Sequence, residues 1–210
     1  MVQNSDEWFL ARMGKFTSSQ IYRLMKSGRG KDEYFGKMAY SYIGETVSEI
    51  LTGERKDFSS KATEWGHRWE PSARERYEFE TGRKVTLTGF VQDPKFDYVG
   101  GSPDGLVGAF GQIEIKCPHS SDVHLKYLQI KSYADFESAV KDNGYDWQIQ
   151  NNMRVVGSEW CDFVSFDPRF DWNKQIKIFR VEKNAKMWEE LEERLSAATE
   201  ELLKIKYTVG

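Results

Sequence analysis

A short apolar strand with a carboxylate and an ammonium on one face constrains this sequence most. It lies in the stretch from Gly101 to Pro118, which reads GSPDGLVGAFGQIEIKCP. Alternate side chains of a strand point to opposite faces, so Glu114 and Lys116 share one face, roughly 6.5 Å apart. The apolar residues of 113–117 face the other way, into a core. Charged groups in an apolar strand are costly unless they are paired or bind a metal. The stretch therefore predicts a buried strand that carries a charged site.

The acid upstream of this strand completes a candidate metal site. Asp104 lies in a Ser-Pro-Asp-Gly turn, and in a hairpin it reaches the same spot as Glu114 if it ends the preceding strand. Both are hard oxygen ligands of the kind that Mg²⁺ takes, and a metal-bound water is nucleophilic. Lys116 would orient or deprotonate that water, or neutralise developing charge. The alternative is an ordinary hairpin with a surface Glu–Lys pair. The flanking Ser-Pro-Asp-Gly and Cys-Pro sequences favour metal-assisted phosphodiester hydrolysis.

These residues resemble a known family. Pro103-Asp104 followed by Glu114-Ile115-Lys116 is similar to the PD-(D/E)XK nuclease signature. The wording SPDGL…IEIKCP most resembles the phage lambda-type exonuclease branch, also called viral alkaline exonucleases or YqaJ-type recombinases. The resemblance implies an α/β fold with a restriction-endonuclease-like core, a central mixed sheet flanked by helices. It implies one domain over residues 1–210, with N-terminal helices (about 1–60) packed on the catalytic core.

The resemblance adds a third carboxylate to the site. The family pattern Gly-x-x-x-Glu-x-x-Ala-Arg is similar to the stretch from Gly66 to Arg74, and its Glu lies at the metal site. Glu70 is therefore a candidate catalytic residue. From the residues alone, Glu70 is equally a solvent-facing side chain at a helix N-terminus. His67 is as consistent with packing as with function.

A pocket for a DNA 5′-phosphate is also implied by the resemblance. Taken alone, Arg12 is a surface charge and Ser19 a residue of a first helical turn. The family's Arg-x-Gly-x-x-Thr-x-Ser stretch is similar to residues 12–19, and the family uses the Ser before the Pro-Asp pair and the second Gln of a Gln-x-Gln helix. The implied pocket residues are Arg12, Ser19, Ser102 and Gln150, with Gln148 in support. Asp93 matches a further family acid only with a shifted alignment.

Apolar periodicity predicts the order of helices and strands. Helices are expected at 32–52, at 62–81, from 120–122 to about 130, around the DWQIQNNMRVVG stretch and from 185 to about 205. Strands are expected at 84–92, 96–101, 113–117, 160–166 and 174–181. Pro71 predicts a kink or a helix start near Glu70. The polar segment 131–145 reads as a loop.

Composition narrows the class of protein. The 210 residues include 30 basic and 33 acidic residues, for a net charge of −3, so a nucleic-acid surface requires clustered basic residues. The two cysteines form no metal-ligand spacing and no disulfide framework. They are too few for the four ligands of an iron–sulfur cluster. We see no signal peptide and no transmembrane run, so we expect a soluble cytoplasmic protein, in the host cytoplasm if a phage encodes it.

The combined expectation is a Mg²⁺-dependent exonuclease, with Mn²⁺ as a substitute metal. The resemblance implies digestion of one strand of linear duplex DNA from its 5′ end, which leaves 3′ single-stranded tails for recombination. It also implies a ring-shaped homotrimer and a single-strand annealing protein as partner. The alternatives are a repair or restriction endonuclease on the same core, and a catalytically silent module that binds DNA ends.

Overall fold

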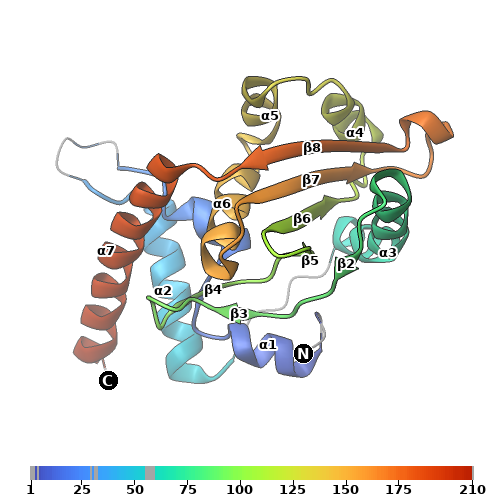
Figure 1. Cartoon of the computed structure of the whole chain (residues 1–210). Coiled ribbons are helices and arrows are strands. Elements are labelled where there is room, and N and C mark those ends of the chain that lie inside the picture. The colour runs from blue at the N-terminus through green and yellow to red at the C-terminus, as the bar shows by residue number, and fades with distance from the viewer. Residues whose placement is uncertain (1–2, 4, 29, 31–32, 55–59, 210) are drawn as a thin grey trace.

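The strand with Glu114 and Lys116 lies in the middle of a five-stranded sheet (Figure 1). The computed structural model describes residues 3, 5–28, 30, 33–54 and 60–209. In spatial order the sheet contains β2 (Val85–Thr86), β5 (Gly105–Val107), β6 (Gly111–Lys116), β7 (Trp160–Phe166) and β8 (Ile176–Glu182). β6 and β7 are parallel, and the other neighbours are antiparallel. The predicted central mixed sheet is confirmed.

The two faces of this sheet are covered by different helices, so the side-chain alternation of β6 decides what each residue meets. One face packs against α3 (Lys61–Thr81), where Ile113, Ile115 and Cys117 join Ala73 and Tyr77 in a core cluster. The opposite face is covered by α4 (Ser121–Leu128), α5 (Tyr133–Val140) and α6 (Tyr145–Val156). Glu114 and Lys116 point to this second face, as predicted. Both cysteines are buried free thiols.

A smaller sheet joins the N-terminal part of the chain to the segment before the site. Its order is β1 (Phe16–Thr17), β4 (Val99–Gly101) and β3 (Val91–Gln92), with β1 parallel to β4. The prediction of one strand over 84–92 was wrong, because β2 and β3 belong to different sheets. Leu87, between the two strands, is 62% exposed, and the chain crosses between the sheets there.

The N-terminal helices form a second core with the C-terminal helix. α1 (Asp6–Arg12), the 3₁₀ helix η1 (Ser18–Arg23) and α2 (Lys37–Thr52) precede the sheets, and α7 (Ala185–Val209) closes the chain. α2 and α7 lie side by side in Figure 1 and share a buried apolar cluster with η1 and β4. α2 ends at Gly53, in the left-handed conformation that glycine adopts easily.

The helix expected at 62–81 is confirmed, whereas a helix start near Glu70 and a loop over 131–145 are not observed. α3 begins after Ser60, whose hydroxyl accepts the Thr63 N–H, and runs through Pro71 rather than starting near Glu70. Pro71 and His67 are both exposed, so water can satisfy the carbonyl that proline leaves without a donor. The segment 131–145 is not a loop, because α5 forms there with a capping box at its N-terminus.

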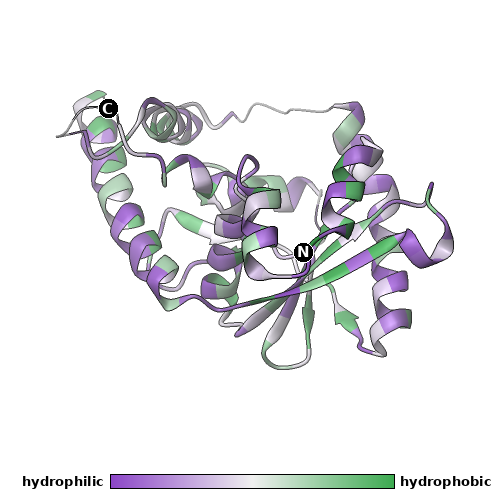
Figure 2. Cartoon of the chain, turned by 90° about the horizontal axis from the view of Figure 1, so that it is seen from above, coloured by the Kyte–Doolittle hydropathy of each residue, from purple (hydrophilic) through white to green (hydrophobic). Residues whose placement is uncertain are grey.

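Hydropathy follows this layered arrangement. Figure 2 shows hydrophobic segments on the interior strands and frequent hydrophilic residues on the outer helices. Among the described residues, no helix is long and apolar enough to span a bilayer.

Candidate active site

Glu114 is the most enclosed charged group of the site, with 1% of its surface exposed. Its Oε1 accepts hydrogen bonds from Lys116 Nζ at 2.6 Å and from Gln148 Nε2 at 2.5 Å. Its Oε2 accepts from Asn152 Nδ2 at 3.2 Å. A buried carboxylate is tolerated when it is paired and hydrogen-bonded in this way. The α6 helix and the β6 strand therefore hold this carboxylate jointly.

Asp104 lies beside Glu114. Asp104 immediately precedes β5, the strand that pairs with β6, and does not end that strand. The backbone N–H of Asp104 donates to the Ile113 carbonyl at 3.2 Å, and its carboxylate accepts the Ile115 N–H at 2.7 Å. The backbone N–H and the carboxylate of Asp104 therefore bond to the residues immediately before and after Glu114. Burial raises the pKa of Asp104 well above its ordinary value, and the nearby charges of Glu114 and Glu70 raise it further.

Lys116 is enclosed by groups that favour its charged form. Burial acts to lower its pKa, but Glu114, Tyr145 and Asp104 raise it above the ordinary value. The ammonium also lies 4.2 Å from the centre of the Tyr145 ring, a cation–π contact. Lys116 is therefore a fixed positive charge in the absence of a metal, which favours charge stabilisation over proton abstraction as its role.

Glu70 approaches the pair from α3 but is held by its own partner. Its Oε1 accepts from Arg74 at 3.0 Å. Its charge raises the pKa of Asp104, and it contributes, after burial, to a pKa of about 12 for Cys117. Within the described ranges, no three acidic, histidine or cysteine side chains are gathered closely enough to hold an ion. His67 is exposed on the same helix.

The residues present fit a divalent cation. Two carboxylates lie close together in the site, and the pKa of Asp104 is raised first by burial and then by the charge of Glu114. A cation between Asp104 and Glu114 would relieve that repulsion. Mg²⁺ takes one or two carboxylates and fills its other positions with water and phosphate oxygens, so a third protein ligand is not required.

Two of the predicted phosphate residues meet at the end of β4. Ser102 Oγ accepts from Trp8 Nε1 at 3.0 Å and from Arg12 at 3.3 Å. The Arg12 guanidinium lies 3.9 Å from the Trp8 ring centre. The sequence alone does not reveal the role of Trp8, because nothing local indicates that its indole N–H reaches Ser102. Ser102 immediately precedes the Pro103-Asp104 pair, so this cluster adjoins the acidic site.

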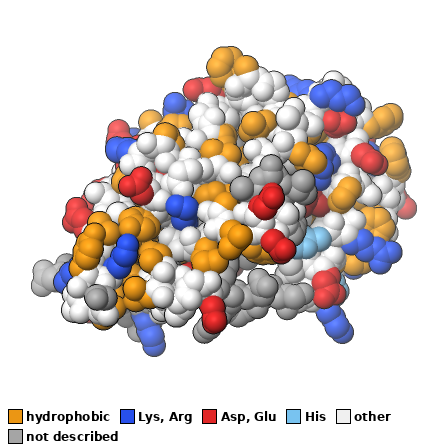
Figure 3. All heavy atoms as spheres, turned by 90° about the horizontal axis from the view of Figure 1, so that it is seen from below, with side chains coloured by type: hydrophobic (Ala, Val, Ile, Leu, Met, Phe, Trp, Pro, Cys, Tyr) orange, Lys and Arg blue, Asp and Glu red, His pale blue; other side chains and the backbone are white. Residues whose placement is uncertain are grey.

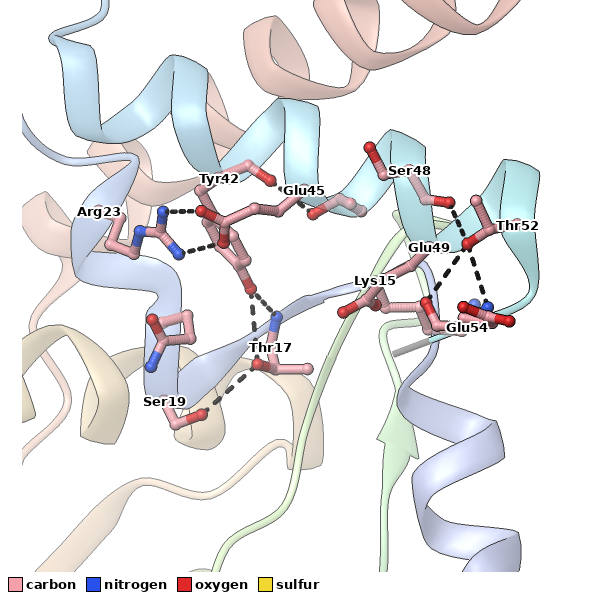
Figure 4. A pocket seen from close by; sticks show the side chains of 12 residues that line it. Lys15, Thr17, Ser19, Arg23, Tyr42, Glu45, Ser48, Glu49, Thr52 and Glu54 are labelled. Carbon is pink, nitrogen blue, oxygen red and sulfur yellow. Dashed lines mark hydrogen bonds and ion pairs between the residues drawn. The ribbon is translucent and has the colours of Figure 1, made fainter. Parts of the chain in front are cut away.

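Ser19 is not part of the cluster that Trp8, Arg12 and Ser102 form. It lines a cavity of about 820 Å³ between β1, η1 and α2, drawn in Figure 4, and its hydroxyl is 3.5 Å from Thr17 Oγ1. The Tyr42 hydroxyl accepts the Thr17 N–H at 2.7 Å. Burial raises the pKa of Tyr42, while the nearby Arg12 charge counteracts this. Tyr42 and Thr17 therefore connect the surroundings of Ser19 and Arg12.

Gln150, which the resemblance assigns to the phosphate pocket, is bonded to other groups, whereas Gln148, assigned a supporting role, contacts the acidic site. Gln150 faces away from the acidic site, where its Nε2 donates to the Glu182 carbonyl and its Oε1 accepts from Asn184 N and Trp188 Nε1. Gln148 donates to Glu114 instead. Two residues apart on a helix is about 200°, so the two side chains point to opposite sides. The geometry thus favours Gln148 over Gln150 as the glutamine of the site.

Asp93 has a structural environment. It forms a buried ion pair with Arg154, and its other oxygen accepts the backbone N–H groups of Lys95 and Phe96. These bonds hold the turn between β3 and β4 against α6.

On the face shown in Figure 3, basic and acidic side chains are interspersed with hydrophobic ones.

Comparisons with known proteins bear on this geometry. Residues 7–159 match the family described as YqaJ-like viral recombinase domain. The chain is similar to an alkaline exonuclease (LHK-Exo) from Laribacter hongkongensis, with 33% identity, a TM-score of 0.83, and coverage of 98% of this chain and 96% of that one. A second structure of LHK-Exo, in complex with dAMP, gives 34% identity and the same TM-score and coverage.

A phage related exonuclease from Haemophilus somnus 129PT has 17% identity and a TM-score of 0.77, and the match covers 93% of this chain and 96% of that one. At that identity the likeness concerns the fold alone. No curated protein matches this sequence. The likeness to the alkaline exonuclease structures confirms the predicted restriction-endonuclease-like core.

Proposed function

The chain belongs to the YqaJ-like viral recombinase family, and from that premise we propose that it is an exonuclease that degrades linear double-stranded DNA. One observation carries this proposal beyond family membership. Glu114 is buried and accepts a hydrogen bond from the half-buried Lys116, and the half-buried Asp104 carboxylate accepts the N–H of Ile115, the residue after Glu114. A catalytically silent binding module has no need of two mutually repelling carboxylates at the same place.

The proposed cofactor is Mg²⁺, with Mn²⁺ as a substitute, held by Asp104 and Glu114. When bound, such a cation lowers the pKa of a coordinated water and stabilises negative charge on the phosphate. Lys116 supplies a second, fixed positive charge for the phosphorane-like transition state. Gln148 and Asn152 keep the Glu114 carboxylate in place through their hydrogen bonds.

We further propose that digestion starts at a 5′-phosphorylated end. Arg12 and Ser102 are already in contact, and Ser102 is two residues from Asp104. A phosphate bound by a guanidinium and a hydroxyl there would place the adjacent phosphodiester near the carboxylates, which converts binding into positioning. Digestion from this end leaves 3′ single-stranded tails for annealing. A ring-shaped homotrimer and a single-strand annealing partner belong to this proposal by family resemblance.

A comparison of linear and circular DNA tests the proposed function. The protein is incubated with a linear duplex and with the same duplex as a covalently closed circle, in Mg²⁺ and in EDTA. We expect the linear form to be degraded only with Mg²⁺, while the circle stays intact. Cleavage of the circle would support an endonuclease on the same core, and inactivity on both would support a silent end-binding module.

A further inference from the structure

A buried polar face of α6 meets the acidic site. Helix α6 is buried continuously from Gln148 to Val155, and most of the side chains in this span are polar. Such groups are costly unless they find partners. Gln150 bonds the start of α7, and Asn151 donates to Ser18 Oγ at 2.8 Å. Asn152 points from the same helix to Glu114.

Asn152 is the partner of a particular oxygen. In the part of the chain that the structure describes, it makes the one hydrogen bond to Glu114 Oε2, since Lys116 and Gln148 both donate to Oε1. A carboxylate held at both oxygens cannot turn about its last torsion. Asn152 thus fixes the orientation of the oxygen that Lys116 leaves available.

The other end of the Asn152 amide carries a cost. A carboxylate only accepts, so the Nδ2 atom must face Glu114 and the Oδ1 atom must face β4. This Oδ1 is buried and has no hydrogen-bond partner among the described residues. An unsatisfied buried acceptor destabilises a fold. A residue selected for stability alone would not be placed this way.

Gly101 provides the space that this orientation requires. A Cβ at Gly101 would overlap Asn152 Oδ1 and lie 2.6 Å from Ser18 Oγ. Any larger residue there would force the Asn152 amide and the Ser18 hydroxyl to move. The missing side chain at Gly101, at the end of β4, therefore permits the orientation of the Asn152 amide on α6. This contact lies next to the Ser102-Pro103-Asp104 turn.

We propose that Asn152 is a positioning residue, which orients Glu114 for the metal and the DNA phosphate. In the same proposal, Gly101 leaves the space that the Asn152 amide needs for this orientation. This inference rests on the proposed function. Asn152 itself does not touch substrate. Its removal should weaken cation binding and slow the chemical step, and it should leave the affinity for duplex DNA unchanged.

The test uses Asn152→Leu, which keeps the number and branching of the side-chain heavy atoms and removes both polar atoms. Cation binding is measured by titrating Mn²⁺ and following the melting temperature, which requires no turnover. We expect Mn²⁺ to bind about 10-fold more weakly or worse, because losing an outer partner of a metal ligand costs 10–100-fold. We expect kcat on linear duplex to fall by a similar factor at unchanged KM.

A matched control separates positioning from packing. Ser158 is also buried, and its hydroxyl lacks a hydrogen-bond partner within the described ranges. Ser158→Ala should therefore keep the wild-type cation affinity and kcat. Wild-type cation affinity and kcat in Asn152→Leu would overturn the inference. So would losses in Asn152→Leu that Ser158→Ala reproduces. If Asn152→Leu does not fold, Asn152→Ala is measured with the same two outcomes.

The steric part has its own readout. Gly101→Ala should lower the melting temperature in EDTA, and the loss should be smaller when Asn152 is already alanine, because one of the two clashing atoms is then absent. Equal losses in both backgrounds would overturn the link between Gly101 and Asn152. An inactive wild-type protein that still binds Mn²⁺ in an Asn152-dependent manner would overturn the proposed function and leave this inference standing.

Discussion

Replacing Asp104 with asparagine should stabilise the metal-free protein while abolishing turnover. The side chain keeps an oxygen for the Ile115 N–H but loses the charge that burial and the neighbouring carboxylates disfavour. Each unit by which the folded-state pKa exceeds the unfolded value corresponds to about 1.36 kcal/mol. We expect a gain of at least about 1 kcal/mol in unfolding free energy near pH 8. For a chain of this size, that raises Tm by about 2–4 °C.

The sign of the pH dependence follows from the same shift. The folded-state pKa of Asp104 is raised, so its contribution to stability is fully present below the unfolded pKa of about 3.9 and is lost as pH rises through the folded value. In EDTA, the stability difference between Asp104→Asn and wild type should therefore grow with pH above about 4. The assay is thermal or urea unfolding of both proteins across this range.

Magnesium should reverse the order of stability. A ligand at 100 times its Kd stabilises the folded state by about 2.7 kcal/mol, and we expect this gain in wild type but not in Asp104→Asn. The activity of the variant should fall about 10³-fold or more, since the metal supplies several kcal/mol of transition-state stabilisation. A variant that is less stable than wild type in EDTA, or that retains Mg²⁺-dependent turnover, would refute this reasoning.

Four further variants separate the roles of the other residues. Lys116→Met should bind DNA and cation normally while kcat falls about 10²–10³-fold, and a loss confined to DNA binding in a filter assay would contradict the charge-stabilising role. Gln148→Leu should lower kcat about 10–100-fold with little change in Tm. Gln150→Leu should lower Tm by several degrees and keep the kcat of the folded fraction. The reverse pattern would reassign the roles of the two glutamines. Arg12→Ala should slow digestion of 5′-phosphorylated duplex about 10-fold or more and leave 5′-hydroxyl duplex nearly unaffected, and equal slowing of both would argue against a phosphate pocket.

The parts of the site predicted from sequence depend on short-range geometry. A strand alternates with period two, so Glu114 and Lys116 could be placed on one face and Ile113 and Ile115 on the other. The structure confirms both placements. Asp104 was expected within reach of Glu114, and the hairpin of β5 and β6 brings it there from the start of β5.

The parts that could not be predicted depend on long-range packing. Gln148 and Gln150 lie on one helix, and the sequence does not say which of them the sheet will cover. The contact of Asn152 with Glu114 depends on how α6 packs against the sheet. The contact of Trp8 with Ser102 depends on the position of α1 at the end of β4. By contrast, α5 could have been found, because Ser132 and Asp135 form a recognisable capping box.

The proposed activity is tested most directly by the first nucleotide released from a labelled linear duplex. Two substrates carry the label at the 5′ or the 3′ terminal nucleotide, and wild type and Glu114→Gln are compared in Mg²⁺. The account predicts immediate release of the 5′ label as a mononucleotide by wild type, retention of the 3′ label in shortened strands, and no release by Glu114→Gln. Earlier release of the 3′ label, or equal release by Glu114→Gln and wild type, would contradict it.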